Sequence, residues 1–379
     1  MQRYVRSQSL AETVSRWGCQ PVERYQHDKQ IGEGTYGKVY KGFSCADKRP
    51  IASKRIRTDF SKTSDPTERR NDGFPLTAIR EIALLHLLRH TRIVNLIEVA
   101  VSHPERYFSG EGAVVIIFEY CDHDLAGLHN SPSAKVMFTP PAIKNIMYQL
   151  LQALAHCHDR RVLHRDIKMS NVLINANGDV KLCDFGLARR ISKTITQSKR
   201  PMTPKVVTRW YRAPEVFLGD KGYSWPIDIW SVGCIFAELL TGEAPFRSAT
   251  DSEAVNRIWD ICGSPDFNDW PEASELPSYR SFGGAVRKES RFLQHFAKVG
   301  NDPSMEGALD LLQKMLQLNP RKRITASDAL DHHYFTVQPS PSISMASIEE
   351  SHEFEVRKLR KSGQSQYFAP MPSAKRTRV

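Results

Sequence analysis

Residues 164–186 read HRDIKMSNVLINANGDVKLCDFG, and the fold is decided by this stretch. Within it, Asn177-Gly178 is a dipeptide typical of tight hairpin turns, and it predicts two short strands in NVLINANGDVKLCD. Charged and amide residues stand on both sides of that hairpin, in HRDIKMSN before it and in DFG after it. The stretch therefore predicts a short hairpin framed by candidate catalytic residues.

These framing residues have the chemistry that phosphate transfer requires. Asp166 can orient a substrate hydroxyl and accept its proton, and Lys168 can neutralise charge on the γ-phosphate of a nucleotide. Asn171 supplies an amide oxygen and Asp184 a carboxylate, and Mg²⁺ prefers hard oxygen ligands of this kind. We therefore expect Asp166, Lys168 and Asn171 to be catalytic, and Asn171 and Asp184 to hold the metal.

A glycine-rich motif, Gly32-x-Gly34-x-x-Gly37-x-Val39, lies earlier in the chain. A dinucleotide-binding motif of this spacing would need a helix directly after the third glycine. Here KVYKGF continues as a strand instead, which suits a flap folded over nucleotide phosphates, because glycine lets the backbone approach phosphate oxygens closely. A plain hairpin turn is the structural alternative at this position.

Lys54 lies in the strand candidate that contains IASK, and a lysine on the inner face of a sheet needs an anion. Glu81 is one candidate anion, and the α and β phosphates of ATP are the other. Lys54 would bridge the two, with Glu81 holding it in position for phosphate binding. The alternative is an ordinary core helix whose Glu81 reaches solvent.

The helix that supplies Glu81 is expected within NDGFPLTAIREIALLHLLRH, residues 71–90, opened by Pro75. At about 100° per residue, one stripe that includes Glu81 collects Ala78, Ile82, Leu85 and Leu88. The opposite face, which includes Arg80, collects Ile79, Ala83, Leu84 and Leu87. A helix that is apolar on both faces is normally buried on all sides, so this helix is expected to have two neighbours.

Composition limits the class of protein. The chain has 379 residues, of which 40% are hydrophobic and 25% charged, as in soluble globular proteins. No apolar run approaches the ~18 residues of a membrane-spanning helix, and the N-terminus has no apolar core like a signal peptide's. Seven cysteines without a C-x-x-C pair read as free thiols in a reducing compartment. The net charge of +11 favours acidic or phosphorylated partners, or serves solubility alone.

Four segments are expected along the chain. An N-terminal extension covers 1–24, and a small antiparallel sheet with one helix covers 25–122. A mainly helical lobe covers 123–336, and a basic, disordered tail covers 337–379. The expected strands lie in YQHDKQIGEGTYGKVYKGF, RPIASKRIR and GAVVIIFEYCD, and the expected long helices lie in PPAIKNIMYQLLQALAHCHDR, PIDIWSVGCIFAELLTG and ALDLLQKMLQL.

The motifs also have a fixed order. After DFG come APE, which ends at Glu215, then Asp228 in DIWSVG and Arg323 in NPRKRIT. In this order the set matches the signatures of eukaryotic protein kinases, which implies an α+β, bilobal fold. Over roughly residues 17–336 the chain resembles a cyclin-dependent kinase, on the basis of GEGTYGKVY, GFPLTAIREI, DFGLAR and VVTRWYRAPE.

Two branches of that family are similar to the chain. WGCQPVERYQ, RPMTPKVVTRWYRAPE and YCDHDLAGL resemble the PITSLRE-type branch, members ten and eleven in the family's count. EYCDHDLAGL and GFPLTAIREI are also similar to the RNA-polymerase-tail kinases. The chain departs from the family in a longer segment between Lys54 and the helix, in Ile51 and Ser53 of the IASK strand, and in Arg209, where many members carry leucine.

The resemblance implies ATP and Mg²⁺ as cofactors and a cyclin as partner, which Ile79, Leu84 and Leu87 would contact. Phe118 would lie at the back of the ATP pocket, with hinge residues Glu119 and Cys121 bonding adenine through their backbone. The implied ATP-binding residues are Ile31, Gly32, Gly34, Gly37, Val39, Lys54, Glu81, Phe118, Glu119 and Cys121. Thr35 and Tyr36 occupy inhibitory phosphorylation positions of the family, or are ordinary loop residues.

Three arginines occupy family positions that converge on one point: Arg80, Arg165 and Arg189. Arginine cannot shed its proton, so three close guanidiniums need a dianion. The resemblance assigns that role to phosphate on Thr203, which is followed by Pro204.

The expected activity is phosphorylation of serine or threonine before proline, in transcription, RNA processing or cell-cycle control. Alternatives are a cyclin-independent enzyme like a MAP kinase, although the activation loop lacks that class's T-x-Y, and a pseudokinase scaffold. No membrane association and no direct nucleic-acid binding are expected. The basic tail segments RKLRK and AKRTRV favour the nucleus over the cytoplasm, or are merely solvated.

Overall fold

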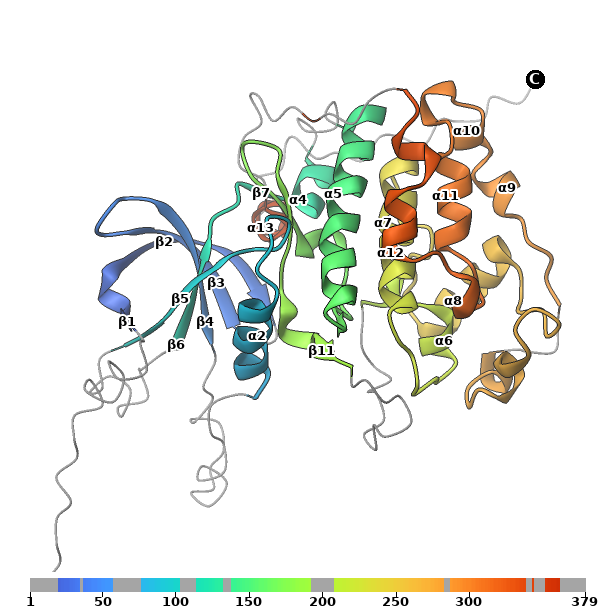
Figure 1. Ribbon diagram of the computed structural model, residues 1–379, viewed down its shortest axis with the longest axis horizontal. Coiled ribbons are helices and arrows are strands. Elements are labelled where there is room, and N and C mark those ends of the chain that lie inside the picture. Colours follow the sequence, from blue (N-terminus) through green and yellow to red (C-terminus); the bar gives the residue numbers. More distant parts are fainter. Residues whose placement is uncertain are drawn as a thin grey trace, which may run out of the picture.

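The structure is a computed structural model, and it describes residues 20–34, 37–56, 76–102, 114–131, 138–191, 208–282, 287–338, 343 and 352–361. Two lobes lie side by side: a twisted sheet with one helix against it, and a larger body made mostly of helices (Figure 1). Within the described ranges, no helix has the length and apolar character needed to cross a membrane.

The smaller lobe is a six-stranded sheet in the order β1-β5-β6-β4-β3-β2. Its strands are β1 Gln20–Pro21, β2 Tyr25–Gly34, β3 Gly37–Ser44, β4 Pro50–Ile56, β5 Leu96–Val101 and β6 Val114–Glu119. The strands expected in the glycine-rich, IASK and GAVVIIFEYCD segments are confirmed as β2, β3, β4 and β6. One edge differs from the expected antiparallel sheet, because β1 pairs with β5 in parallel. Residues of the expected N-terminal extension thus form part of the sheet.

Within the described residues of this lobe, the α-helix is α2, Leu76–Leu87. Ala78, Leu85 and Leu88 are buried as expected, and Ile79 and Leu87 are 49% and 38% exposed. Leu84, however, is only 6% exposed and belongs to the main core, so its expected place on the outward face is wrong. The reason is geometric: Leu84 lies three residues after Glu81 and four before Leu88, which places it on the buried stripe.

The larger lobe is built around two long helices, α5 Pro140–Asp159 and α7 Pro226–Thr241. Both begin with proline, whose missing N–H has no intrahelical partner at that position. Nearly all of α7 is buried, including Trp230 in its first half. The other α-helices in the described ranges are α4 Leu125–Asn130, α6 Pro214–Phe217, α8 Asp251–Cys262, α9 Phe292–His295, α10 Ala297–Gly300, α11 Ala308–Met315, α12 Ala326–Leu330 and α13 Glu353–Lys361.

Two small sheets lie where the lobes meet. One has the order β10-β9-β7, and the other pairs β11 with β8. The bounds are β7 His123–Asp124, β8 Val162–Leu163, β9 Val172–Ile174, β10 Val180–Leu182 and β11 Arg189–Arg190. The expected hairpin is confirmed: β9 and β10 are antiparallel, and Gly178 in their turn has a φ of 81°, which glycine adopts without strain.

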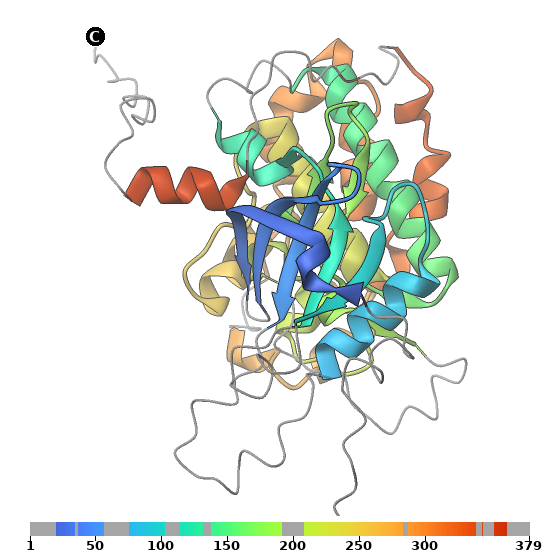
Figure 2. The ribbon, with the colours of Figure 1, turned by 90° about the vertical axis from the view of Figure 1, so that its left-hand side faces the viewer.

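The expectation of a disordered tail is wrong for Glu353–Lys361, which form α13. Figure 2 shows α13 as the red helix beside α4 and the end of β2, far from the helices that precede it in sequence. RKLRK is part of this helix. Val356 is 7% exposed and His352, just before the helix, is 4% exposed, so the segment packs against the body of the molecule.

Candidate active site

A cavity of about 350 Å³ lies between the two lobes. Its lining includes nine of the expected ATP-binding residues: Ile31, Gly32, Gly37, Val39, Lys54, Glu81, Phe118, Glu119 and Cys121. Gly34 ends β2 opposite Gly37. The lining also includes the four residues expected to carry catalysis and metal binding: Asp166, Lys168, Asn171 and Asp184. Thr35, Tyr36 and Thr203 lie outside the described residues. Residues far apart in sequence thus meet in one pocket.

The inner end of the pocket holds a three-residue ionic network. Lys54 Nζ donates to both carboxylate oxygens of Glu81, at 2.8 and 2.9 Å, and to Asp184 Oδ1 at 2.9 Å. Burial alone would lower the pKa of Lys54, but the carboxylates of Asp184 and Glu81 outweigh it and raise that pKa. The ammonium therefore stays charged at neutral pH, and Glu81, 2% exposed, does not reach solvent.

Asp166 is held by contacts on both of its carboxylate oxygens. Lys168 Nζ donates to Oδ2 at 2.7 Å, and the Asn171 amide nitrogen donates to the Asp166 carbonyl at 2.7 Å and to Oδ2 at 3.2 Å. Thr208 donates to Oδ1 from its backbone N–H and its hydroxyl, both at 3.3 Å. Because the Asn171 nitrogen is used in this way, its oxygen points away from Asp166 and is available to a cation.

The backbone next to Asp166 and at Asp184 is strained, and buried side chains hold it by hydrogen bonds. Arg165 and Asp184 have positive φ values of 66° and 61°, which non-glycine residues rarely adopt. Asp228 in α7, 1% exposed, accepts the backbone N–H groups of His164 and Arg165 at 3.0 and 2.9 Å. His164 Nε2 bonds the Cys183 carbonyl at 2.9 Å, which ties the strand before Asp184 to the loop of Asp166.

The three expected phosphate-binding arginines differ in environment. Arg165 is 5% exposed, and its guanidinium donates to the Leu187 carbonyl at 2.7 Å and to the Tyr223 hydroxyl at 3.3 Å. Burial raises the pKa of Tyr223, and the charges of Arg165 and Arg189 act in the opposite direction. Arg165 therefore bonds the Tyr223 hydroxyl, Arg189 in β11 is partly buried, and Arg80 is exposed on α2.

Four residues of the C-terminal segment also line the cavity: His352, Glu353, Phe354 and Arg357. The Glu353 backbone N–H donates to Asp124 Oδ2 at 2.8 Å. Sequence reasoning missed them because they follow a polar, proline-rich stretch; the one local signal was the pair Glu353 and Arg357, spaced i,i+4 as on a helix and joined as an ion pair.

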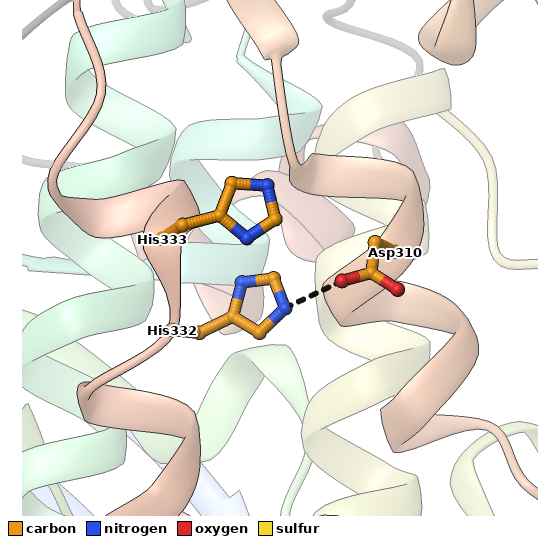
Figure 3. A group of neighbouring side chains, drawn as sticks. All are labelled: Asp310, His332 and His333. Atoms are coloured by element: carbon orange, nitrogen blue, oxygen red, sulfur yellow. Dashed lines mark hydrogen bonds and ion pairs between the residues drawn. The ribbon is translucent and has the colours of Figure 1, made fainter.

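A second cluster, Asp310, His332 and His333, lies in the helical lobe away from this cavity (Figure 3). His332 Nδ1 accepts the Tyr334 N–H at 3.2 Å, so its Nε2 carries the proton and donates to Asp310 at 2.8 Å. Lys314 Nζ also lies 2.8 Å from the same Asp310 oxygen. A metal would need an unprotonated Nε2 and would meet this ammonium, so the arrangement favours structural hydrogen bonds.

The comparisons with known proteins agree with this site. The family model described as protein kinase domain matches residues 25–335. The chain belongs to the protein kinase family. Within it, the chain is 42% identical over 366 residues to cyclin-dependent kinase C-1 of Oryza sativa subsp. japonica, covering 93% of this chain and 66% of that protein. It is 38% identical over 324 residues to human cyclin-dependent kinase 9, covering 86% of this chain and 83% of that protein.

A solved structure gives the same result. The crystal structure of the yeast RNA Pol II CTD kinase complex contains a chain that matches with a TM-score of 0.72 and 30% identity, covering 90% of this kinase and 98% of that chain. The kinase is thus a cyclin-dependent kinase by family, and its fold is the bilobal kinase fold expected. These relatives support the similarity to RNA-polymerase-tail kinases and not the PITSLRE-type branch. The kinase spans 66% of the length of the first curated relatives it matches.

Proposed function

We propose that this kinase is a cyclin-dependent, ATP- and Mg²⁺-dependent serine/threonine kinase that phosphorylates residues followed by proline. The observation that carries the proposal is the convergence of Asp166, Lys168 and Asn171 with the Lys54–Glu81–Asp184 network on one cavity. A pseudokinase scaffold has no need of this complete set. A cyclin-independent enzyme like a MAP kinase is disfavoured, because the relatives named above are cyclin-dependent kinases.

The chemistry follows from the groups on Asp166. A substrate hydroxyl would donate to the Asp166 carboxylate and pass its proton to it while the hydroxyl oxygen bonds to the γ-phosphorus and ADP leaves. The neighbouring Lys168 ammonium would balance negative charge on the transferred group, and Thr208 would keep the carboxylate oriented. The proton would thus pass to the Asp166 carboxylate, which is held in place by contacts on both of its oxygens.

The donor groups in the cavity fit a nucleotide and a magnesium ion. The Asn171 amide oxygen and the Asp184 carboxylate are hard oxygen donors, and Mg²⁺ bound there would neutralise phosphate charge. Lys54 would contact the α and β phosphates while Glu81 holds its ammonium in place. Ile31, Val39 and Phe118 offer apolar surface to the adenine, and Phe354 of α13, with His352 just before that helix, would close the outer side of the pocket.

The exposed side of α2 supports the cyclin assignment. Ile79 and Leu87 on α2, and Ile97 on β5, are large apolar residues that are 38–49% exposed. A cyclin covering Ile79 and Leu87 would fix the position of α2 and hence of Glu81. Activation would then be a shift in population toward the state in which Lys54 and Glu81 are paired.

Sequence selectivity gives the first test. Val206 and Val207, which lie outside the described residues, would form a shallow pocket for the substrate residue that follows the phosphorylated one. Proline has no backbone N–H, so it would lose no hydrogen bond in such a pocket. With the cyclin bound, Ser-Pro peptides should be phosphorylated about tenfold faster or more than matched Ser-Ala peptides on an array. Equal rates on the two sets would contradict a proline-directed kinase.

Phosphorylation of Thr203 gives the second test. The phosphate would accept charge-assisted hydrogen bonds from Arg80, Arg165 and Arg189. It would thereby link α2, the loop that carries Asp166 and the segment that carries Thr203. Because Pro204 follows it, a related kinase or a second copy of this one would be the modifying enzyme. Thr203→Ala should lower kcat/KM about ten- to a hundredfold with the cyclin present, and Arg80→Ala should mimic that loss. Full activity of the variant, with no phosphate found on wild-type Thr203 by mass spectrometry, would refute this switch.

The relatives suggest where the kinase acts. One similar structure is that of a yeast RNA Pol II CTD kinase. We therefore propose the CTD, the tail of RNA polymerase II, as a substrate and the nucleus as the site of action. A reconstituted assay with that tail as substrate tests the assignment directly.

A further inference from the structure

The polypeptide leaves the C-terminal lobe at a fixed point before it returns to the pocket. Lys144 in α5 is fully buried, and its Nζ donates to the Val337 carbonyl at 2.8 Å. The same ammonium lies over the ring of Tyr334, 4.8 Å from its centroid. The start of the C-terminal segment is thereby attached to α5, the longest helix among the described residues.

A second attachment lies at the turn between β9 and β10. A Cβ atom on Gly178 would stand 2.5 Å from Ile343 Cγ2, so the absence of a side chain at Gly178 makes the space that Ile343 occupies. The Ile343 side chain is partly buried against the main core. The turn itself is held to α5, because Gln149 Nε2 donates to the Gly178 carbonyl at 3.1 Å and Gln149 Oε1 accepts the Val180 N–H at 2.9 Å.

The β9–β10 hairpin, which Ile343 contacts, also pairs with β7, and the first residue of α13 is hydrogen-bonded to β7. β9 pairs with β7, where Asp124 stands opposite Leu173. Asp124 in turn accepts the Glu353 N–H at 2.8 Å, and Tyr120 in the hinge bonds His352 at 3.3 Å. The attachment of Ile343 and the start of α13 therefore rest on one small sheet, whose strands also lead from Asn171 and to Asp184.

We propose that Gly178 and Ile343 form a seat that sets the register of the C-terminal segment, so that α13 lies over the nucleotide pocket. Both are positioning residues: neither lines the cavity, and they act through His352, Glu353, Phe354 and Arg357, which do. The proposal rests on the proposed function in one respect, because it takes the ligand of the cavity to be ATP. Loss of the contact between Gly178 and Ile343 frees α13 and weakens nucleotide binding. The carboxylate of Asp166, which accepts the substrate proton, is left unchanged.

The test uses the full chain with its cyclin and the variant Ile343→Asp, which places a charge in the apolar seat. The KM for ATP should rise about fivefold, the order expected when one buried aliphatic contact is lost, with kcat within about twofold of wild type. Amide hydrogen exchange in 353–361 should become faster. Ile343→Val, which keeps the apolar contact, should restore both values. Leu293→Asp introduces the same charge on α9, where the side chain is 61% exposed, and should change neither.

Two results would overturn the proposal. One is unchanged exchange in α13 for Ile343→Asp, and the other is faster exchange with an unchanged KM for ATP. Ile343→Ala provides a second, uncharged variant at the same contact and should shift exchange and KM in the same direction as Ile343→Asp, by a smaller amount. ATP affinity is also measured by calorimetry: a chain whose affinity depends on Ile343 but which phosphorylates no peptide would refute the proposed function and leave the seat in place.

Discussion

Replacing Asp166 with asparagine is expected to lower kcat about 10²–10⁴-fold, the range that general-base catalysis contributes, while ATP affinity stays nearly unchanged. Asparagine has almost the same shape and can still accept hydrogen bonds from Thr208 through its oxygen. It cannot take up the proton of the substrate hydroxyl, and it leaves Lys168 without the carboxylate that now lies 2.7 Å from its ammonium. The measurement is kcat on a Ser-Pro peptide with the cyclin bound, together with ATP affinity by calorimetry.

Asp310→Asn is the matched control for this experiment. It makes the same change on α11, where the carboxylate bonds His332 and Lys314, outside the cavity, and it should leave kcat unchanged. If Asp166→Asn kept near-wild-type kcat, Asp166 would not be the proton acceptor. If ATP affinity fell together with kcat, the carboxylate would act on the nucleotide, and the division of roles between Asp166 and the Lys54 network would be wrong.

Most of this site could be predicted because short sequence motifs contain the residues that form it. The hairpin turn at Asn177-Gly178 fixes how the chain passes from Asn171 to Asp184, so both reach the same cavity. The partnership of Lys54 with Glu81 also followed from elementary electrostatics, since a lysine on an inner face and a carboxylate on a buried helix stripe each need an opposite charge.

The errors arise where a residue's environment depends on distant parts of the chain. Leu84 lies at the edge of the buried stripe of α2, beside Leu88, and the main core packs against that edge as well. β1 is two residues long and is defined by its pairing with β5, about 80 residues later in the chain. The α13 segment is strongly charged, and its order depends on contacts with Asp124 and β2 that no local pattern announces.

Replacing Arg323 with methionine is expected to lower the free energy of unfolding by about 3–5 kcal/mol, because it leaves a buried carboxylate without its cation. Arg323 and Glu215 are 2% and 1% exposed and form a bidentate pair, with N–O distances of 2.7 and 3.0 Å. The guanidinium also donates to the Pro226 carbonyl at 2.8 Å and to the Gln317 carbonyl at 3.0 Å. Chemical denaturation monitored by circular dichroism measures the loss.

The double variant Glu215→Leu/Arg323→Met separates the cost of an unpaired charge from the net contribution of the pair. With both charges removed, the free energy of unfolding should recover most of the loss, because apolar residues of similar volume often replace a buried ion pair at little cost. Arg321→Met is the control two residues away: Arg321 pairs with Glu272 at 2.6 Å, but its side chain is 76% exposed, so its loss should cost no more than about 1 kcal/mol. A double variant as unstable as the sum of its single variants would mean that Glu215 and Arg323 stabilise the kinase separately, through the carbonyls around Arg323 and not through each other.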